Sequence, residues 1–199
     1  MNNDTNNPFE TYKTLVMVGK PGSGKGTQAK LVADKTGWKV FSTGDKFREL
    51  KKADTPLGRK IKETIDGGKL MPYWFASFLF EEAVVYLPSE EGIVYEGAGR
   101  LPSEAALFHD VMSWLERPYR AVYLDVPAEV VMERLKKRKL IEGRADDEEE
   151  KIKVRLAVHE KEVEPAMDVF REKGTLLHIN GDQAIEKVHE EILAKLGTA

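Results

Sequence analysis

Short apolar runs alternate with more polar segments along most of the chain. Buried parallel strands are continuous apolar runs, and runs of this kind lie at residues 14–18, 38–41, 93–95, 121–126 and 175–179. A helix is expected directly after the first run, over residues 25–36. This alternation predicts an α/β fold with a parallel sheet of about five strands and helices on both faces.

Helical periodicity marks the end of the chain and one long internal segment. A final helix should bury an apolar face formed by Ile185, Val188, Ile192 and Leu196. Two segments look inserted between the strands. Residues 45–88 are expected to be mostly helical, and residues 136–150 form a short, charged stretch.

The length of 199 residues suits one globular domain with small insertions. The Asn-rich residues 1–12 are expected to be a disordered extension, and residues 13–199 to be a single domain. The core of that domain should comprise residues 13–44, 89–135 and 151–199.

Composition narrows the class of protein. The net charge is −3 with both signs mixed along the chain, which disfavours a nucleic-acid binder driven by a basic surface. The chain has no cysteine, so disulfides and thiolate metal sites are excluded and a reducing compartment fits. The polar N-terminal residues do not resemble a signal peptide, and no apolar run reaches the length of a membrane span. We therefore expect a cytoplasmic protein without a membrane partner.

A glycine-rich loop follows the first apolar run. Residues 19–27 read GKPGSGKGT and lie between the expected first strand and first helix. Glycines let backbone N–H groups converge on a phosphate, and the helix N-terminus adds its positive dipole end. Lys25 can reach the β- and γ-phosphates of a nucleotide, and the Thr27 hydroxyl can bind Mg²⁺. Gly26 takes the place that Ser or Thr usually has directly after the lysine.

This loop resembles that of adenylate kinases and related nucleoside monophosphate kinases. Further segments match the family in the same order: residues 42–48 (STGDKFR), 68–72 (GKLMP), 96–100 (EGAGR) and 143–147 (GRADD), with Arg155 beyond them. The resemblance covers about residues 15–196. It implies a P-loop NTPase-type three-layer fold in which residues 45–88 are the monophosphate-binding insertion and residues 136–150 a short lid.

The resemblance implies Mg²⁺-dependent, reversible transfer of the γ-phosphoryl group of ATP to AMP. ATP would be bound by Gly22, Ser23, Gly24, Lys25, Gly26, Thr27, Arg134, Arg138 and Gln183. The monophosphate would be bound by Thr43, Arg48, Lys69, Leu70, Met71, Gly97, Arg100, Glu104, Arg144 and Arg155. The catalytic residues would be Lys25, Arg100, Arg138, Arg144 and Arg155. Arginines suit this chemistry, because phosphoryl transfer depends on positioning and charge stabilisation and a guanidinium binds phosphate at two points.

The metal and the partners follow from the same resemblance. Mg²⁺ would be held with ATP through Thr27, and through Glu96 by way of water. The expected lid has no Cys or His pair, so no structural zinc is expected. The partners would be small nucleotides, and the enzyme a monomer.

Three positions depart from the family pattern. Glu96 replaces an aspartate, Ala98-Gly99 replaces a Phe-Pro pair, and Glu104 replaces the glutamine that reads adenine. An ionised carboxylate has no donor for adenine N1 but suits the N–H groups of guanine. Glu104 would otherwise face solvent at the start of a helix, and we favour that interpretation. The alternatives are GMP or a pyrimidine monophosphate as acceptor, or a poorly active nucleotide-binding regulator.

Overall fold

The computed structural model describes residues 8–67, 69, 71–142 and 148–198. In these residues one parallel sheet has the strand order β2-β3-β1-β4-β5. The strands are β1 Thr14–Gly19, β2 Lys39–Ser42, β3 Ile93–Glu96, β4 Tyr119–Asp125 and β5 Leu176–Asn180. The predicted fold class and all five predicted strands are confirmed, with bounds that differ by one or two residues.

The register brings the carboxyl ends of the strands to one edge of the sheet. Thr14 of β1 lies opposite Ile93 on one side and opposite Tyr119 on the other, and every pairing is parallel. The segments that follow β1, β2 and β3 therefore leave the sheet close to one another. In open parallel sheets ligands bind outside this edge.

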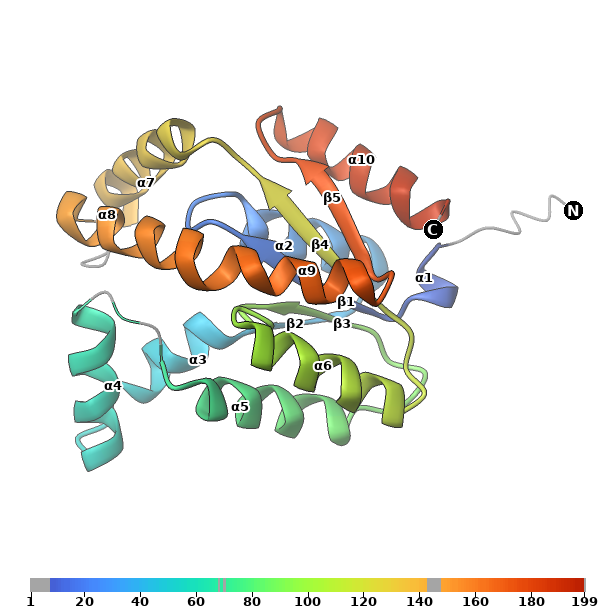
Figure 1. Cartoon of the computed structure of the whole chain (residues 1–199), viewed down its shortest axis with the longest axis horizontal. Helices are drawn as coiled ribbons and strands as arrows, with labels where there is room; N and C mark the ends of the chain where they lie inside the picture. The colour runs from blue at the N-terminus through green and yellow to red at the C-terminus, as the bar shows by residue number, and fades with distance from the viewer. Residues whose placement is uncertain (1–7, 68, 70, 143–147, 199) are drawn as a thin grey trace, which may run out of the picture.

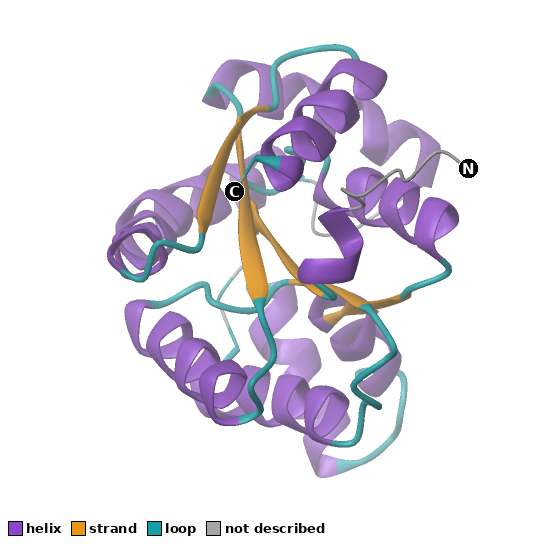
Figure 2. Ribbon diagram, turned by 90° about the vertical axis from the view of Figure 1, so that its right-hand side faces the viewer, coloured by secondary structure: helices purple, strands orange, loops and turns teal. Residues whose placement is uncertain are grey.

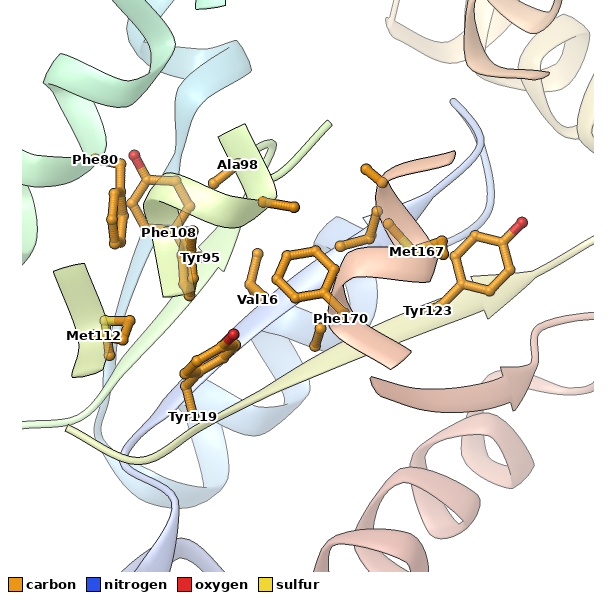
Figure 3. Packing of buried hydrophobic residues seen from close by; sticks show 14 of the residues in the cluster. Val16, Phe80, Tyr95, Ala98, Phe108, Met112, Tyr119, Tyr123, Met167 and Phe170 are labelled. Atoms are coloured by element: carbon orange, nitrogen blue, oxygen red, sulfur yellow. The ribbon is translucent and has the colours of Figure 1, made fainter. Parts of the chain in front are cut away.

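Helices cover both faces of the sheet (Figures 1 and 2). Side chains alternate between the faces along a strand, so Leu15 and Met17 belong to one apolar cluster and Val16 and Val18 to another. The first face is covered by α2 Lys25–Thr36 and α10 Ile185–Gly197. The second is covered by α5 Tyr73–Val85, α6 Pro102–Trp114 and α9 Glu164–Glu172. Phe80, Tyr95, Phe108 and Phe170 are the aromatic centre of that second cluster (Figure 3).

The expected disorder of residues 1–12 is wrong where the structure describes them. Residues Pro8–Thr11 form a short helix, α1, and residues 1–7 lie outside the described part. Phe9 is 7% exposed and packs edge-on against Trp38, with ring centroids 5.1 Å apart. This aromatic residue joins the cluster under α2 and α10, and its burial orders a segment whose composition alone indicates disorder.

The segment 45–88 is mostly helical, as predicted. It contains most of α3 Thr43–Leu50 and all of α4 Pro56–Asp66 and α5. The side chains of Ser42 and Thr55 cap α3 and α4 by accepting backbone N–H groups. A small apolar cluster of its own holds these helices together through Phe47, Ile61 and Phe75. The division of the chain into a core and insertions stays a prediction.

The described parts of the charged stretch 136–150 are largely helical. Helix α7 runs over Ala128–Glu142, and α8 begins at Glu149 and ends at Val158. The two helices pack through Val131, Leu135 and Ile152. A π-helical turn, His159–Val163, then joins α8 to α9. Figure 1 shows α7 and α8 at the same end of the molecule as α3 and α4.

Candidate active site

The glycine-rich loop joins β1 to α2 with its backbone in conformations that favour glycine. Gly22 and Gly24 have φ values of 79° and 101°, and α2 begins at Lys25 directly after Gly24. A Cβ at Gly22 would lie 2.8 Å from Leu135 Cγ, so α7 packs directly on the loop. The loop, the first turn of α2 and α7 line one cavity, in which the N-terminus of α2 favours a phosphate.

Lys25 folds back onto this loop. Its Nζ donates to the backbone oxygens of Gly19, at 2.9 Å, and Lys20, at 2.8 Å. Burial, together with the charges of Arg100, Arg155 and Arg138, lowers the pKa of the Lys25 ammonium to about 8 against the opposing effect of Glu96. A bound polyphosphate would favour the charged form and draw the ammonium away from the two carbonyls.

A cavity of about 630 Å³ opens beside the loop. Every residue predicted to bind ATP lines it: Gly22, Ser23, Gly24, Lys25, Gly26, Thr27, Arg134, Arg138 and Gln183. Arg134 reaches across from α7 to donate to the Gly181 backbone oxygen at 3.1 Å. Gln28 and Ile185 also line the cavity, and the Gln28 side-chain amide donates a hydrogen bond to the Ile185 backbone oxygen. These two residues were not predicted from the sequence, because they are far apart in the chain and belong to no local motif.

A second cavity, of about 130 Å³, lies between α3, α5 and the turn after β3. The predicted monophosphate residues that line it are Arg48, Lys69, Met71, Gly97, Arg100, Glu104 and Arg155. Apolar side chains, among them Phe47, Ile65 and Val158, form the rest of its wall. Thr43 is buried and does not line the cavity, but a Cβ at Gly97 would lie 3.3 Å from its Cβ. Leu70 and Arg144 lie outside the described residues.

The two cavities are joined by a third, and its lining is strongly cationic. Lys25 comes from the loop, Arg100 from the turn after β3, and Arg138 and Arg155 from α7 and α8. Arg48 and Arg100 also line the second cavity, so the cationic cluster lies between the two. Such a junction can hold the phosphates of two nucleotides end to end, with guanidinium and ammonium groups around the point of transfer.

Comparison with known proteins agrees with this geometry. The model of the adenylate kinase family matches residues 17–175. Adenylate kinase 1 of Nostoc sp. is 36% identical over 185 residues, which cover 92% of this chain and 98% of the relative. Adenylate kinases of Micrococcus luteus and Bacillus subtilis are 36% and 31% identical, over 90% and 92% of this chain and 88% and 97% of their own lengths. The chain belongs to the adenylate kinase family.

The favoured interpretation of Glu104, that it faces solvent, is wrong. Its side chain does not face solvent: Glu104 is 6% exposed, and its Oε2 accepts the Arg100 backbone N–H at 2.7 Å. The helix start was predicted correctly, since α6 begins at Pro102. An acid at the third helical position can fold back onto the free N–H groups before the helix, and this interaction turns the carboxyl inward.

Glu96 lies where the loop and the cationic cluster meet. A Cβ at Gly26 would be 3.3 Å from Glu96 Oε2, so a glycine at this position leaves room for the longer carboxylate. Glu96 and Thr27 line the same cavity and offer oxygen atoms, the ligands that Mg²⁺ prefers. Among the described residues no group of three or more His, Cys, Asp or Glu side chains is arranged to hold a metal alone. The donor set therefore fits a metal that is held largely by nucleotide phosphates and water.

Among the described residues of the chain, no helix is long and apolar enough to span a membrane.

Proposed function

We propose that this chain is an adenylate kinase that transfers the γ-phosphoryl group of ATP to AMP, reversibly, to give two ADP. One observation carries the proposal: a large cavity at the phosphate-binding loop and a smaller, partly apolar cavity meet at a cluster of Lys25, Arg100, Arg138 and Arg155. The relatives that match nearly the whole chain are named adenylate kinase.

In this proposal, residues at different positions in the site bind ATP, bind the acceptor and stabilise the transferring group. The loop N–H groups and the start of α2 hold the β- and γ-phosphates of ATP, and Lys25 exchanges its two carbonyl partners for phosphate oxygens. Arg48 and Arg100 hold the phosphate of the acceptor in line with them. Arg138 and Arg155 offset the charge that spreads over the transferring group.

Mg²⁺ is part of the proposal and would arrive with ATP. The Thr27 hydroxyl would hold it directly and Glu96 through water. When bound, the metal supplies further positive charge between the phosphates. Glu96 has a side chain one methylene longer than aspartate, and the missing side chain of Gly26 accommodates it.

Closure of the segment 136–150, including Arg144, would exclude water from the transferring phosphoryl group. The proposal includes a monomeric enzyme, as the resemblance to the family implies. It also includes a cytoplasmic location, where ATP and AMP are available and a cysteine-free chain is at no disadvantage.

A coupled assay of ADP formation with AMP, GMP, CMP and UMP tests the function directly. We expect AMP to be a substrate and Lys25→Ala to abolish turnover in a folded protein. Arg100→Ala should lower kcat/KM for AMP by at least about tenfold, since a bidentate charged contact contributes about 1.5–3 kcal/mol. The affinity for ATP should change little.

Arg171→Ala is the matched control, because Arg171 is an exposed arginine of α9 that pairs with Asp168. It should leave all the kinetic constants unchanged. If the wild type binds ATP but forms no ADP with any of the four acceptors, the chain is a nucleotide-binding regulator and the proposal fails.

A further inference from the structure

Glu104 is the one acidic side chain that lines the second cavity among the described residues. It does not line the cationic junction, which contains Lys25, Glu96 and Arg138. The residues shared by the two cavities include Arg48, Arg100 and Arg155, and these lie toward the junction. Glu104 also borders a small interior cavity formed by α5, α6 and the turn at Gly99. It therefore lies on the side of the pocket away from the loop.

This position separates two parts of an acceptor nucleotide. The phosphate belongs at the junction, where three arginines can bind it and where it meets ATP. A carboxyl group repels phosphate, so the part of the acceptor beside Glu104 must be its uncharged end. The apolar side chains Phe47, Ile65 and Met71 line the same cavity and suit the faces of a purine ring. Glu104 is thus placed to contact the polar edge of the base.

The edge of adenine presents an acceptor, N1, beside a donor, the N6 amino group. An ionised carboxylate can only accept, so it pairs with N6 and opposes N1. A protonated carboxyl has one donor and one acceptor, the pattern that adenine requires. Guanine presents two neighbouring donors, N1–H and the N2 amino group, and these match the ionised form.

We propose that Glu104 selects the acceptor base, and that it binds the adenine of AMP with its carboxyl group protonated and guanine with its carboxyl group ionised. The inference rests on the proposed function, because it assumes that the second cavity holds the acceptor. The proton comes from solvent when AMP binds and returns to solvent when the nucleotide leaves. The choice between AMP and GMP then depends on pH.

The surroundings of Glu104 support a proton on this group. Burial raises its pKa above the ordinary value, although the Arg100 N–H, the Arg100 guanidinium and the Leu101 N–H oppose the shift. The other charged or titratable groups around the cavity are Arg48, Lys69 and Arg155. The Tyr95 hydroxyl is also near, and its pKa is raised by burial and to a smaller extent by Glu104. A bound acceptor phosphate offsets those cations and so favours the protonated carboxyl further. The Arg100 N–H fixes Oε2 as an acceptor, so Oε1 is the oxygen on which the proposal places the proton.

The ratio of kcat/KM for AMP to that for GMP, measured from about pH 5 to about pH 9, tests the proposal. Titration of ATP, Lys25 and the acceptor phosphate affects both substrates and cancels in the ratio. In the wild type the ratio should fall by at least about tenfold as pH rises, because a mismatched polar pair in a buried site discriminates strongly. Glu104→Gln should make the ratio high and independent of pH, since an amide supplies the donor at every pH.

Glu82→Gln is the matched control, because Glu82 is an exposed acid of α5, a neighbouring helix that also contributes to the cavity wall. It should reproduce the pH dependence of the wild type. Calorimetry in buffers of different ionisation enthalpy adds a measurement that does not depend on turnover. Above the pKa of Glu104, AMP binding should take up about one more proton than GMP binding, and Glu104→Gln should remove this difference.

The possible failures are distinguishable. A wild-type ratio that does not vary with pH, or equal proton uptake for the two nucleotides, overturns the role of Glu104 while the kinase function stands. A Glu104→Gln ratio that follows the wild-type curve does the same. If no monophosphate is phosphorylated at any pH, the proposed function itself fails.

Discussion

At the scale of single residues, the sequence was enough to predict which side chains belong to the candidate site. It was not enough to predict the direction in which each side chain points. The position of Lys25 in the loop follows from the order of strand, glycines and helix, and the structure places it there. Glu104 shows the limit. Its helix start was predictable, but the direction of its carboxyl depends on the Arg100 N–H, which a turn held by Gly97 and Gly99 presents to it.

His159 had no sequence signal at all. Its spacing to the other histidines suggests no metal, yet it is 1% exposed and begins the π-helical turn between α8 and α9. Neither of its ring nitrogens has a hydrogen-bond partner among the described residues. Burial, and then the charges of Lys25, Lys20 and Arg100, lower the pKa of His159 to about 3. The ring is therefore neutral and costs stability through its unpaired polar atoms.

His159→Leu should stabilise the protein, and more strongly in acid. The unfolded state binds more protons than the folded state between the folded pKa of about 3 and the unfolded value of about 6.5. The buried histidine therefore lowers the free energy of unfolding further as pH falls through this window. We expect the free energy of unfolding in urea to rise by about 1–3 kcal/mol at neutral pH and by more at about pH 5. His178→Leu, at an exposed position of β5 beside Asp125, is the control and should change it by less than about 0.5 kcal/mol at neutral pH. A loss of stability at both pH values would contradict the prediction.

At the scale of elements, the helices and strands with a regular apolar pattern were predicted from the sequence. Helices that depend on a single anchoring residue, or whose exposed face is apolar, were not. The strands were found within one or two residues because a buried parallel strand leaves a continuous apolar run. Helix α2 matches its predicted bounds, since the loop starts it and Gly37 ends it with φ 74°. Helix α1 was missed because a single aromatic residue, Phe9, anchors it. The extent of α7 was missed because its exposed Leu140 and Ile141 obscure an amphipathic pattern.

The turn after β3 should depend on Gly99. Its φ is 63°, and a Cβ there would lie 2.6 Å from Phe170 Cζ of α9. Gly99→Ala should therefore lower the free energy of unfolding by about 1–3 kcal/mol, through backbone strain and crowding of the aromatic cluster. Chemical denaturation measures this change. Gly197→Ala, in α10 with open space around the position, should be neutral or stabilising by up to about 1 kcal/mol. Equal effects of the two substitutions would show that the turn tolerates a side chain.

At the scale of the whole molecule, net charge conceals the charge of the site. The chain carries a net charge of −3, yet the cavity junction gathers Lys25, Arg48, Arg100, Arg138 and Arg155. These side chains come from the loop, α3, the turn after β3, α7 and α8. Motif order predicted them as a group, but only the parallel register, which brings the strand ends to one edge, accounts for their meeting.

This concentration of charge should make acceptor capture sensitive to salt. The Debye length falls from about 30 Å at about 0.01 M ionic strength to about 8 Å at about 0.15 M, so the cationic junction attracts a phosphate over a shorter distance. We expect KM for AMP to rise by about threefold or more over this range, with a smaller change in kcat at saturation. Adenosine has the same base without the phosphate, so its inhibition constant against AMP should change by less than about twofold over the same range. Arg48→Ala should weaken the salt dependence for AMP and leave that for adenosine unchanged, because Arg48 lines both cavities at the phosphate end. Equal salt dependence for AMP and adenosine would place the acceptor phosphate outside this cluster.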